Sequence, residues 1–77
     1  MKYTLNQLKQ GENGKIIGFE GGFGLKDKLD ALGLREGTYI TKISDAFIGG
    51  PVTIKINNTK LAIGNGMADK IIVEVDI

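Results

Sequence analysis

The sequence predicts a small, mostly antiparallel β-barrel formed by a single domain, residues 1–77. Five short runs rich in β-branched and aliphatic residues, with hairpin-length connections between several of them, are the first indication. Glycine is the second: 12 of the 77 residues are Gly, about twice the usual share. Tight turns need the positive φ angles that glycine adopts, so this content predicts many turns and short strands. A single helical period between the first two runs is the third indication.

The N-terminal segment predicts one short helical turn before the first strand. Thr4 and Gln7 form a capping box, and Leu5 and Leu8 share one face of the turn. The five expected strands are residues 15–19, 38–44, 51–56, 60–63 and 70–75. In the third strand alternate residues are apolar, and the Asn57-Asn58 pair after it suits a two-residue hairpin turn. Residues 64–68 form a turn or a single helical turn.

A helix is expected between the first and second strands. Leu25, Leu29 and Leu32 are spaced at i, i+4 and i+7, which places them on one helical face. Gly33 follows where a left-handed cap is expected, and Leu34 can fold back onto the last turn. This helix would plug or flank one end of the barrel.

The composition excludes several classes of function. The chain has no Cys and no His, which removes disulfides, thiol nucleophiles, zinc fingers and histidine-based catalysis. A net charge of +1 argues against a dedicated nucleic-acid binder. The N-terminus lacks the apolar core of a signal peptide, and no apolar run approaches the length of a membrane span. A cytoplasmic location is therefore expected.

Two glycine-rich connections carry large apolar residues where polar turn residues are usual. Phe47 and Ile48 lie in residues 46–50, and Phe23 lies in the turn of residues 21–24. Exposed apolar clusters mark binding sites, but these side chains can also fold over the open ends of the barrel. Both interpretations stay open, because a loop over a barrel end can leave a groove beside it.

Three further groups of residues have a functional and a structural interpretation. The glycines of residues 21–24 precede a helix, as in phosphate cradles, but neither nucleotide-binding motif is complete, and a plain turn is favoured. Asp27 and Asp30 can contact a cation jointly, although interleaved lysines favour a solvated face. Arg35, the only arginine, can reach a partner's carboxylate or phosphate, or can simply pair on the surface.

Three lysines fall on strands and can form a positive lane across the barrel: Lys42, Lys55 and Lys60. Such lanes, combined with stacking aromatics, bind nucleic acid in small barrels. Here Tyr39 is the only aromatic residue within the last four strands. Solvated lysines that keep the sheet surface soluble are the favoured interpretation.

The order of motifs along the chain resembles the FeoA family of ferrous-iron transport proteins. The resemblance covers nearly the whole chain and rests on Thr4-Leu5 with Leu8 and Gly11, Gly14-Lys15-Ile16, Lys28-Leu29, Leu32-Gly33-Leu34 with Gly37, Gly49-Gly50-Pro51-Val52, Leu61-Ala62-Ile63, and Ala68, Ile71 and Val73. It departs from the family pattern at Lys28, where the family tends to carry Arg, at Gly64, where it often carries Arg, and at Met67, where it tends to carry an acidic residue.

The resemblance implies a five-stranded SH3-like barrel with one short helix inserted after the first strand. The same module is similar to the C-terminal domain of metal-responsive repressors of the diphtheria-toxin-repressor type. No DNA-binding domain precedes it here, which disfavours a repressor. The resemblance further implies a cytoplasmic companion of FeoB, a GTP-dependent membrane iron transporter, located at the inner face of the plasma membrane.

We therefore expect a non-enzymatic adaptor without a cofactor, which regulates ferrous iron uptake by docking on a FeoB-type transporter. The expected docking residues are Phe23, Leu25, Phe47 and Ile48, because SH3-like folds offer an apolar groove between loops. A competing hypothesis is stimulation of GTP hydrolysis by Arg35, acting on the nucleotide in trans. A stand-alone peptide- or nucleic-acid-binding module and a weak divalent-metal contact are further hypotheses, although no nucleic acid is expected as a partner.

Overall fold

The computed structural model describes residues 1–21, 23–44 and 50–75. These residues form an antiparallel sheet of β1 (Lys2–Thr4), β2 (Asn13–Phe19), β3 (Tyr39–Ser44), β4 (Val52–Ile56), β5 (Thr59–Ile63) and β6 (Ile71–Glu74). Three helices accompany the sheet: the 3-10 helix η1 (Leu5–Gln7), α1 (Phe23–Ala31) and α2 (Asn65–Ala68). The expected N-terminal turn, inserted helix and one-turn helix near residue 65 are all confirmed.

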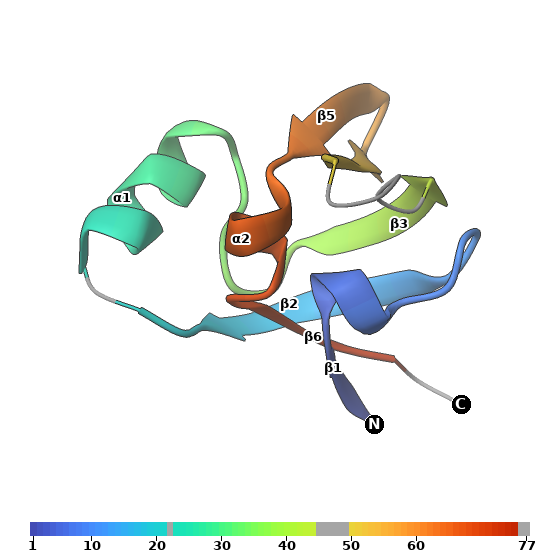
Figure 1. The fold of residues 1–77 in the computed structure, drawn as a ribbon, viewed down its shortest axis with the longest axis horizontal. Coiled ribbons are helices and arrows are strands. Elements are labelled where there is room, and N and C mark those ends of the chain that lie inside the picture. The colour runs from blue at the N-terminus through green and yellow to red at the C-terminus, as the bar shows by residue number, and fades with distance from the viewer. Residues whose placement is uncertain (22, 45–49, 76–77) are drawn as a thin grey trace.

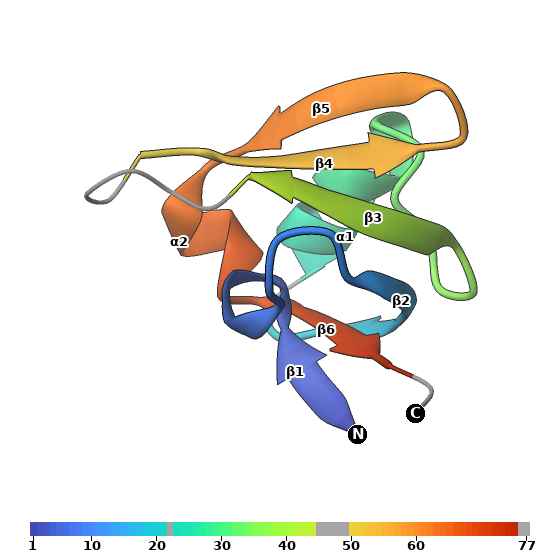
Figure 2. The same ribbon diagram turned by 90° about the vertical axis from the view of Figure 1, so that its right-hand side faces the viewer.

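The strand order is β1-β6-β2-β3-β4-β5, with antiparallel pairing throughout. The register shifts between Ile16 and Gly18 where β2 pairs with β6, and between Lys42 and Ser44 where β3 pairs with β4. Such bulges bend strands and increase their twist. The sheet consequently curls so that β3, β4 and β5 lie over β1, β2 and β6 (Figures 1 and 2). This is the small barrel-type fold that the sequence predicts.

One strand was not predicted, because the described residues form six strands rather than five. β1 pairs with β6, with Tyr3 opposite Val73, and the N-terminal ammonium of Met1 donates to Val75 O at 3.0 Å. A strand of three residues is too short to show the alternation that identifies strands in sequence. The five predicted strands are confirmed, with their ends moved by at most two residues.

The hydrophobic core lies between the two layers of the sheet and receives side chains from the helices as well. Val52, Ile54 and Ile56 point inward from β4, as their alternation predicts. The remaining buried apolar residues are Leu5, Leu8, Ile16, Leu29, Leu34, Ile40, Ile63, Ala68, Ile71 and Val73. Because η1, α1 and α2 all contribute, each helix is fastened to the sheet by apolar contacts.

The end of α1 is a Schellman motif. Gly33 has φ +87°, its N–H donates to Asp30 O at 2.9 Å, and Leu34 N–H donates to Leu29 O at 2.9 Å. Leu29 and Leu34 are both fully buried, as expected. The three-leucine face is only partly confirmed: Leu25 is half-buried, but Leu32 is 45% exposed. Leu32 lies beyond the last helical residue, so the helical period no longer directs it inward.

Replacing Gly33 with Ala is expected to lower the free energy of unfolding by about 1–2 kcal/mol, because an L-residue is strained in the left-handed region. A Cβ at Gly33 meets nothing within 4 Å, so backbone strain is the whole cost. Gly24→Ala in the same helix is the matched control. Gly24 also has open space but no positive φ, so this variant is expected to stabilise by about 0.5 kcal/mol. Urea unfolding measures both variants. An unchanged free energy of unfolding in Gly33→Ala would contradict the cap assignment.

Candidate functional site

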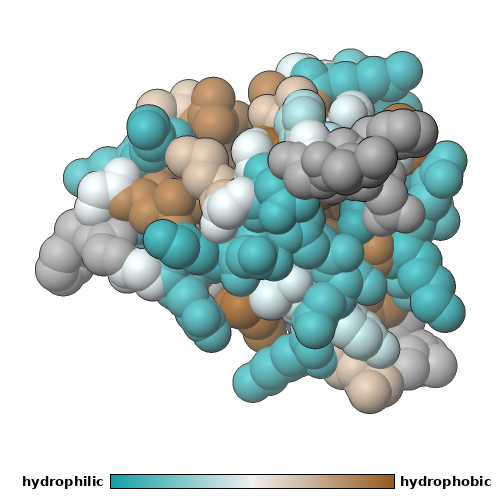
Figure 3. All heavy atoms as spheres, in the orientation of Figure 1, coloured by the Kyte–Doolittle hydropathy of each residue, from teal (hydrophilic) through white to brown (hydrophobic). Residues whose placement is uncertain are grey.

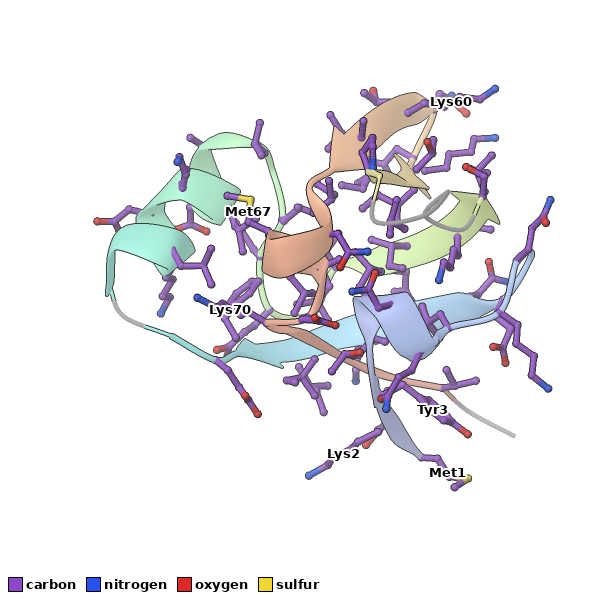
Figure 4. All side chains as sticks on the ribbon, viewed as in Figure 1. Met1, Lys2, Tyr3, Lys60, Met67 and Lys70 are labelled. Carbon is purple, nitrogen blue, oxygen red and sulfur yellow. The ribbon has the colours of Figure 1, made fainter. Side chains whose placement is uncertain are left out.

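An open groove lies between α1 and α2, with a volume of about 630 Å³. Its lining residues, which define the α1–α2 groove, are Gly24, Leu25, Asp27, Lys28 and Met67. Its surface is mainly apolar. Figure 4 shows Met67 extending from α2 toward α1, and Figure 3 shows hydrophobic atoms exposed over α1 among hydrophilic ones. An open hollow with an apolar floor and a charged rim has the chemistry of a protein-docking site.

The α1 wall of the groove is positioned by the turn that enters the helix. Gly21 has φ +117°, a backbone conformation that strains other residues, so glycine is favoured at this turn. A Cβ there would also lie 3.3 Å from Leu25 Cδ2, a tight contact that the leucine side chain would have to relieve. Glu20 N–H donates to Lys70 O at 2.7 Å, which joins the residue after β2 to the residue before β6. The strand that delivers α1 and the segment that follows α2 are therefore fixed to each other beside the groove.

The predicted docking residues have different outcomes. Leu25 lines the groove. Phe23 is the first residue of α1 rather than part of a turn, so the helix begins earlier than expected, and its side chain is not described. Phe47 and Ile48 lie outside the described residues. The role of these four residues in docking therefore stays a prediction.

Arg35 lies in the turn after α1 and does not line the groove. Its Nε is 3.5 Å from Asp30 Oδ1, and its side chain is 72% exposed. The expected surface pairing of Arg35 is therefore present, and its partner is Asp30. A loose pair of this kind contributes little to stability and leaves the guanidinium accessible to a partner.

Sequence reasoning treated Met67 and Lys28 only as departures from the family pattern and placed neither in the docking site. Both line the groove. The sequence did hold a signal for Met67, because it is a large apolar residue next to a Gly-Asn-Gly turn, the same criterion that singled out Phe47. Nothing in the sequence alone placed residue 67 beside residue 25.

The interpretation of Lys42 as a solvated lysine was wrong. Its side chain is 1% exposed, and Nζ donates to Leu8 O at 2.7 Å and to Asn6 O at 3.0 Å. It shares the inward face of β3 with Ile40, so the strand buries it, and carbonyls of η1 and its C-cap accept hydrogen bonds from its ammonium. The three-lysine lane does not exist; only Lys55 and Lys60, directly opposite each other on β4 and β5, face solvent.

A second hollow, of about 400 Å³, lies on the outer face of the sheet. It is lined by Asn13, Tyr39, Ile40, Thr41, Lys55 and Asn57, and we call it the β-face hollow. Tyr39 is 64% exposed, and Thr41 Oγ1 donates to Asn13 Oδ1. One aromatic ring and one lysine are fewer than nucleic-acid-binding barrels present along their grooves.

The two helical aspartates do not come together as a metal site. Asp27 lines the groove, whereas Asp30 is engaged by Arg35. Over residues 1–21, 23–44 and 50–75, no group of three or more Asp, Glu, His or Cys side chains is arranged to hold a metal ion. In the same residues, no helix has the length and apolar character needed to span a bilayer.

Comparison with known proteins identifies the family. The family model of the FeoA domain matches residues 3–75. The chain belongs to the FeoA family. A Methanocaldococcus jannaschii protein named as an Fe(2+) transport protein A is 33% identical to this FeoA chain over 72 residues, which cover 94% of this chain and 85% of that protein.

Solved structures extend the likeness. The crystal structure of an iron uptake regulatory protein (FeoA) matches with a TM-score of 0.88 at 28% identity, covering 96% of this chain and 97% of the other. A FeoA-like protein from Clostridium acetobutylicum matches with a TM-score of 0.85 at 25% identity, covering 99% and 88%. A manganese-dependent transcriptional repressor shares the fold at 13% identity and a TM-score of 0.88; the match covers 97% of this chain and 42% of the repressor.

Proposed function

We propose that this FeoA chain is a cytoplasmic accessory protein of ferrous iron uptake that binds and regulates a FeoB-type GTP-dependent transporter at the inner face of the plasma membrane. Family membership and the named Fe(2+) transport relative support the iron-uptake role. The observation that carries the docking proposal is the α1–α2 groove, which is open and has a mainly apolar surface.

The groove suits a partner segment that inserts one apolar side chain between two polar ones. Leu25 and Met67 offer the apolar contact, and both also pack against the core, so the surface is held in place before binding. Asp27 and Lys28 stand beside each other on the rim. Their opposite charges favour one orientation of a polar flanking segment without attracting anions or cations in general.

Filling the groove is expected to weaken docking while leaving the fold intact. Gly24→Gln places a side chain where a Cβ meets nothing within 4 Å, on a helix that tolerates glutamine. We expect the dissociation constant for the soluble GTP-binding domain of the transporter to rise at least about tenfold, which corresponds to about 1.4 kcal/mol. Isothermal titration calorimetry measures it.

The matched control is Ala31→Gln, which adds the same side chain at an exposed position of α1 that does not line the groove. Its affinity is expected to equal that of the wild type. Equal affinities for Gly24→Gln and the wild type would show that the partner docks elsewhere. A Phe47→Ala, Ile48→Ala double variant then tests the loop residues that the sequence singled out.

Stimulation of GTP hydrolysis is the second candidate role, and the exposure of Arg35 favours it. The guanidinium can leave its surface contact with Asp30 at little cost and reach a nucleotide bound to the partner. Arg35→Ala is then expected to abolish stimulation of GTP hydrolysis without changing the dissociation constant. Unchanged stimulation in this variant would remove the role.

A further inference from the structure

The groove wall that carries Met67 is α2, a helix too short to be stable on its own. α2 has only four residues, and forming a single helical turn in isolation is unfavourable. Its N-cap is Gly64, which has no side chain to bond the free N–H groups. The buried Ala68 fixes one side of the turn. The rest of its support has to come from another part of the chain.

Asn6 of η1 supplies that support. Its Nδ2 lies 2.6 Å from Asp69 Oδ1, 3.1 Å from Asn65 O and 3.4 Å from Asn65 Oδ1. Asn65 is the first residue of α2 and Asp69 is its C-cap. One side-chain amide therefore holds both ends of the helical turn, from a position about sixty residues earlier in the chain. Figure 1 shows η1 and α2 next to each other.

Asn6 itself sits on a rigid support. Its backbone carbonyl accepts a hydrogen bond from the buried Lys42 Nζ at 3.0 Å. Leu5 and Leu8, on either side, are buried in the core, and Gln7 Oε1 accepts the N–H of Thr4 at 2.9 Å. The side-chain amide of Asn6 is thus pre-oriented toward α2, so little conformational entropy is lost when it forms its hydrogen bonds to Asn65 and Asp69.

We propose that Asn6 is the positioning residue of the α1–α2 groove: it sets the place of α2, and through α2 the place of Met67. Lys42, Asn6 and α2 form a continuous connection from the centre of β3 to the groove wall. The part concerning partner affinity rests on the proposed function. Because coupling between sites is reciprocal, an occupant that presses on Met67 also stabilises the contacts of Asn6.

The first test needs no partner. The chain has two methionines, so ¹³C-methyl labelling gives one reporter in the groove, Met67, and one far from it, Met1. In Asn6→Ala the Met67 signal is expected to shift while Met1 stays in place. The amides of Ala68, Asp69 and Lys70, which bond within the turn, are expected to exchange with solvent roughly five- to tenfold faster. Amides of the β3–β4 ladder are expected to keep their rates relative to global unfolding.

The variants separate hydrogen bonding from general destabilisation. Asn6→Asp replaces a donor by a carboxylate that faces Asp69. It should therefore shift the Met67 signal and speed amide exchange in the turn more than Asn6→Ala does. Asp69→Asn keeps an acceptor oxygen and is expected to leave the Met67 signal as in the wild type. Asp69→Ala removes the strongest contact without altering η1, which keeps the test valid if Asn6 variants fold poorly. Asn58→Ala, in the exposed β4–β5 turn, is the matched control.

The inference is overturned if Asn6→Ala and Asp69→Ala show the same Met67 chemical shift and the same amide exchange rates as the control Asn58→Ala. With the soluble GTP-binding domain, Asn6→Ala is expected to bind roughly five- to tenfold more weakly than Asn58→Ala. Equal binding by the two variants would overturn the link to affinity. If the wild type itself does not bind the domain, the proposed function fails, whereas the response of Met67 to Asn6 still decides whether Asn6 positions α2.

Discussion

Replacing Lys42 with Met is expected to lower the free energy of unfolding by about 2–5 kcal/mol. Methionine keeps most of the aliphatic volume but provides no donor. The carbonyls of Asn6 and Leu8 then each lose a charge-assisted hydrogen bond, part-buried at Asn6 and buried at Leu8. A chain of 77 residues has a total stability of roughly 4–11 kcal/mol, so the loss is a large fraction of it. Urea unfolding followed by circular dichroism measures the change.

Lys60→Met is the matched control for this variant. Lys60 is exposed on β5 and lies directly opposite Lys55, so its ammonium satisfies no buried carbonyl. We expect its free energy of unfolding to stay within about 0.5 kcal/mol of the wild type. Equal midpoints for the two lysine variants would mean that the buried ammonium of Lys42 contributes nothing to the fold.

Replacing Leu29 with Ala is expected to lower the free energy of unfolding by about 3–5 kcal/mol. Leu29 is 0% exposed. Among the α1 residues whose side chains are described, it alone is buried. Its carbonyl also accepts the N–H groups of Leu32 and Leu34. The attachment of α1 to the sheet depends on this side chain, so its truncation is also expected to loosen the α1 wall of the groove.

Leu32→Ala provides the comparison within the same segment. Leu32 is 45% exposed, so removing its side chain leaves no closed cavity, and a loss below about 1 kcal/mol is expected. Thermal and urea unfolding of the two variants distinguish the positions. Losses of equal size would contradict the different burial of the two leucines.

Local sequence patterns predicted the fold well wherever the structure of a short segment depends on its own residues. The alternation of Val52, Ile54 and Ile56 predicted their burial, and Gly33 followed by Leu34 predicted the helix cap. β1 was missed because three residues carry no usable period, and its pairing with β6 depends on residues about seventy positions away. Long-range pairing of that kind leaves no local mark in the sequence.

The candidate site was harder to predict because it depends on contacts between distant segments. Alternation placed Lys42 and Ile40 on one face of β3, so the burial of Lys42 was implicit in the pattern. The usual preference of lysine for solvent outweighed that signal, since the carbonyls that accept its hydrogen bonds belong to η1 and its C-cap, far away in the sequence. The same holds for Met67, which lines the groove together with Leu25 although α1 and α2 are distant in the sequence.

An NMR titration of the ¹⁵N-labelled protein with the soluble GTP-binding domain of a FeoB-type transporter tests the docking proposal most directly. We predict chemical-shift changes concentrated at Gly24, Leu25, Asp27, Lys28 and Met67, which line the α1–α2 groove. Gly24→Gln should remove these changes, and Ala31→Gln should retain them. Changes confined to the β-face hollow around Tyr39 and Lys55, or no changes with the domain in excess, would contradict docking through the groove.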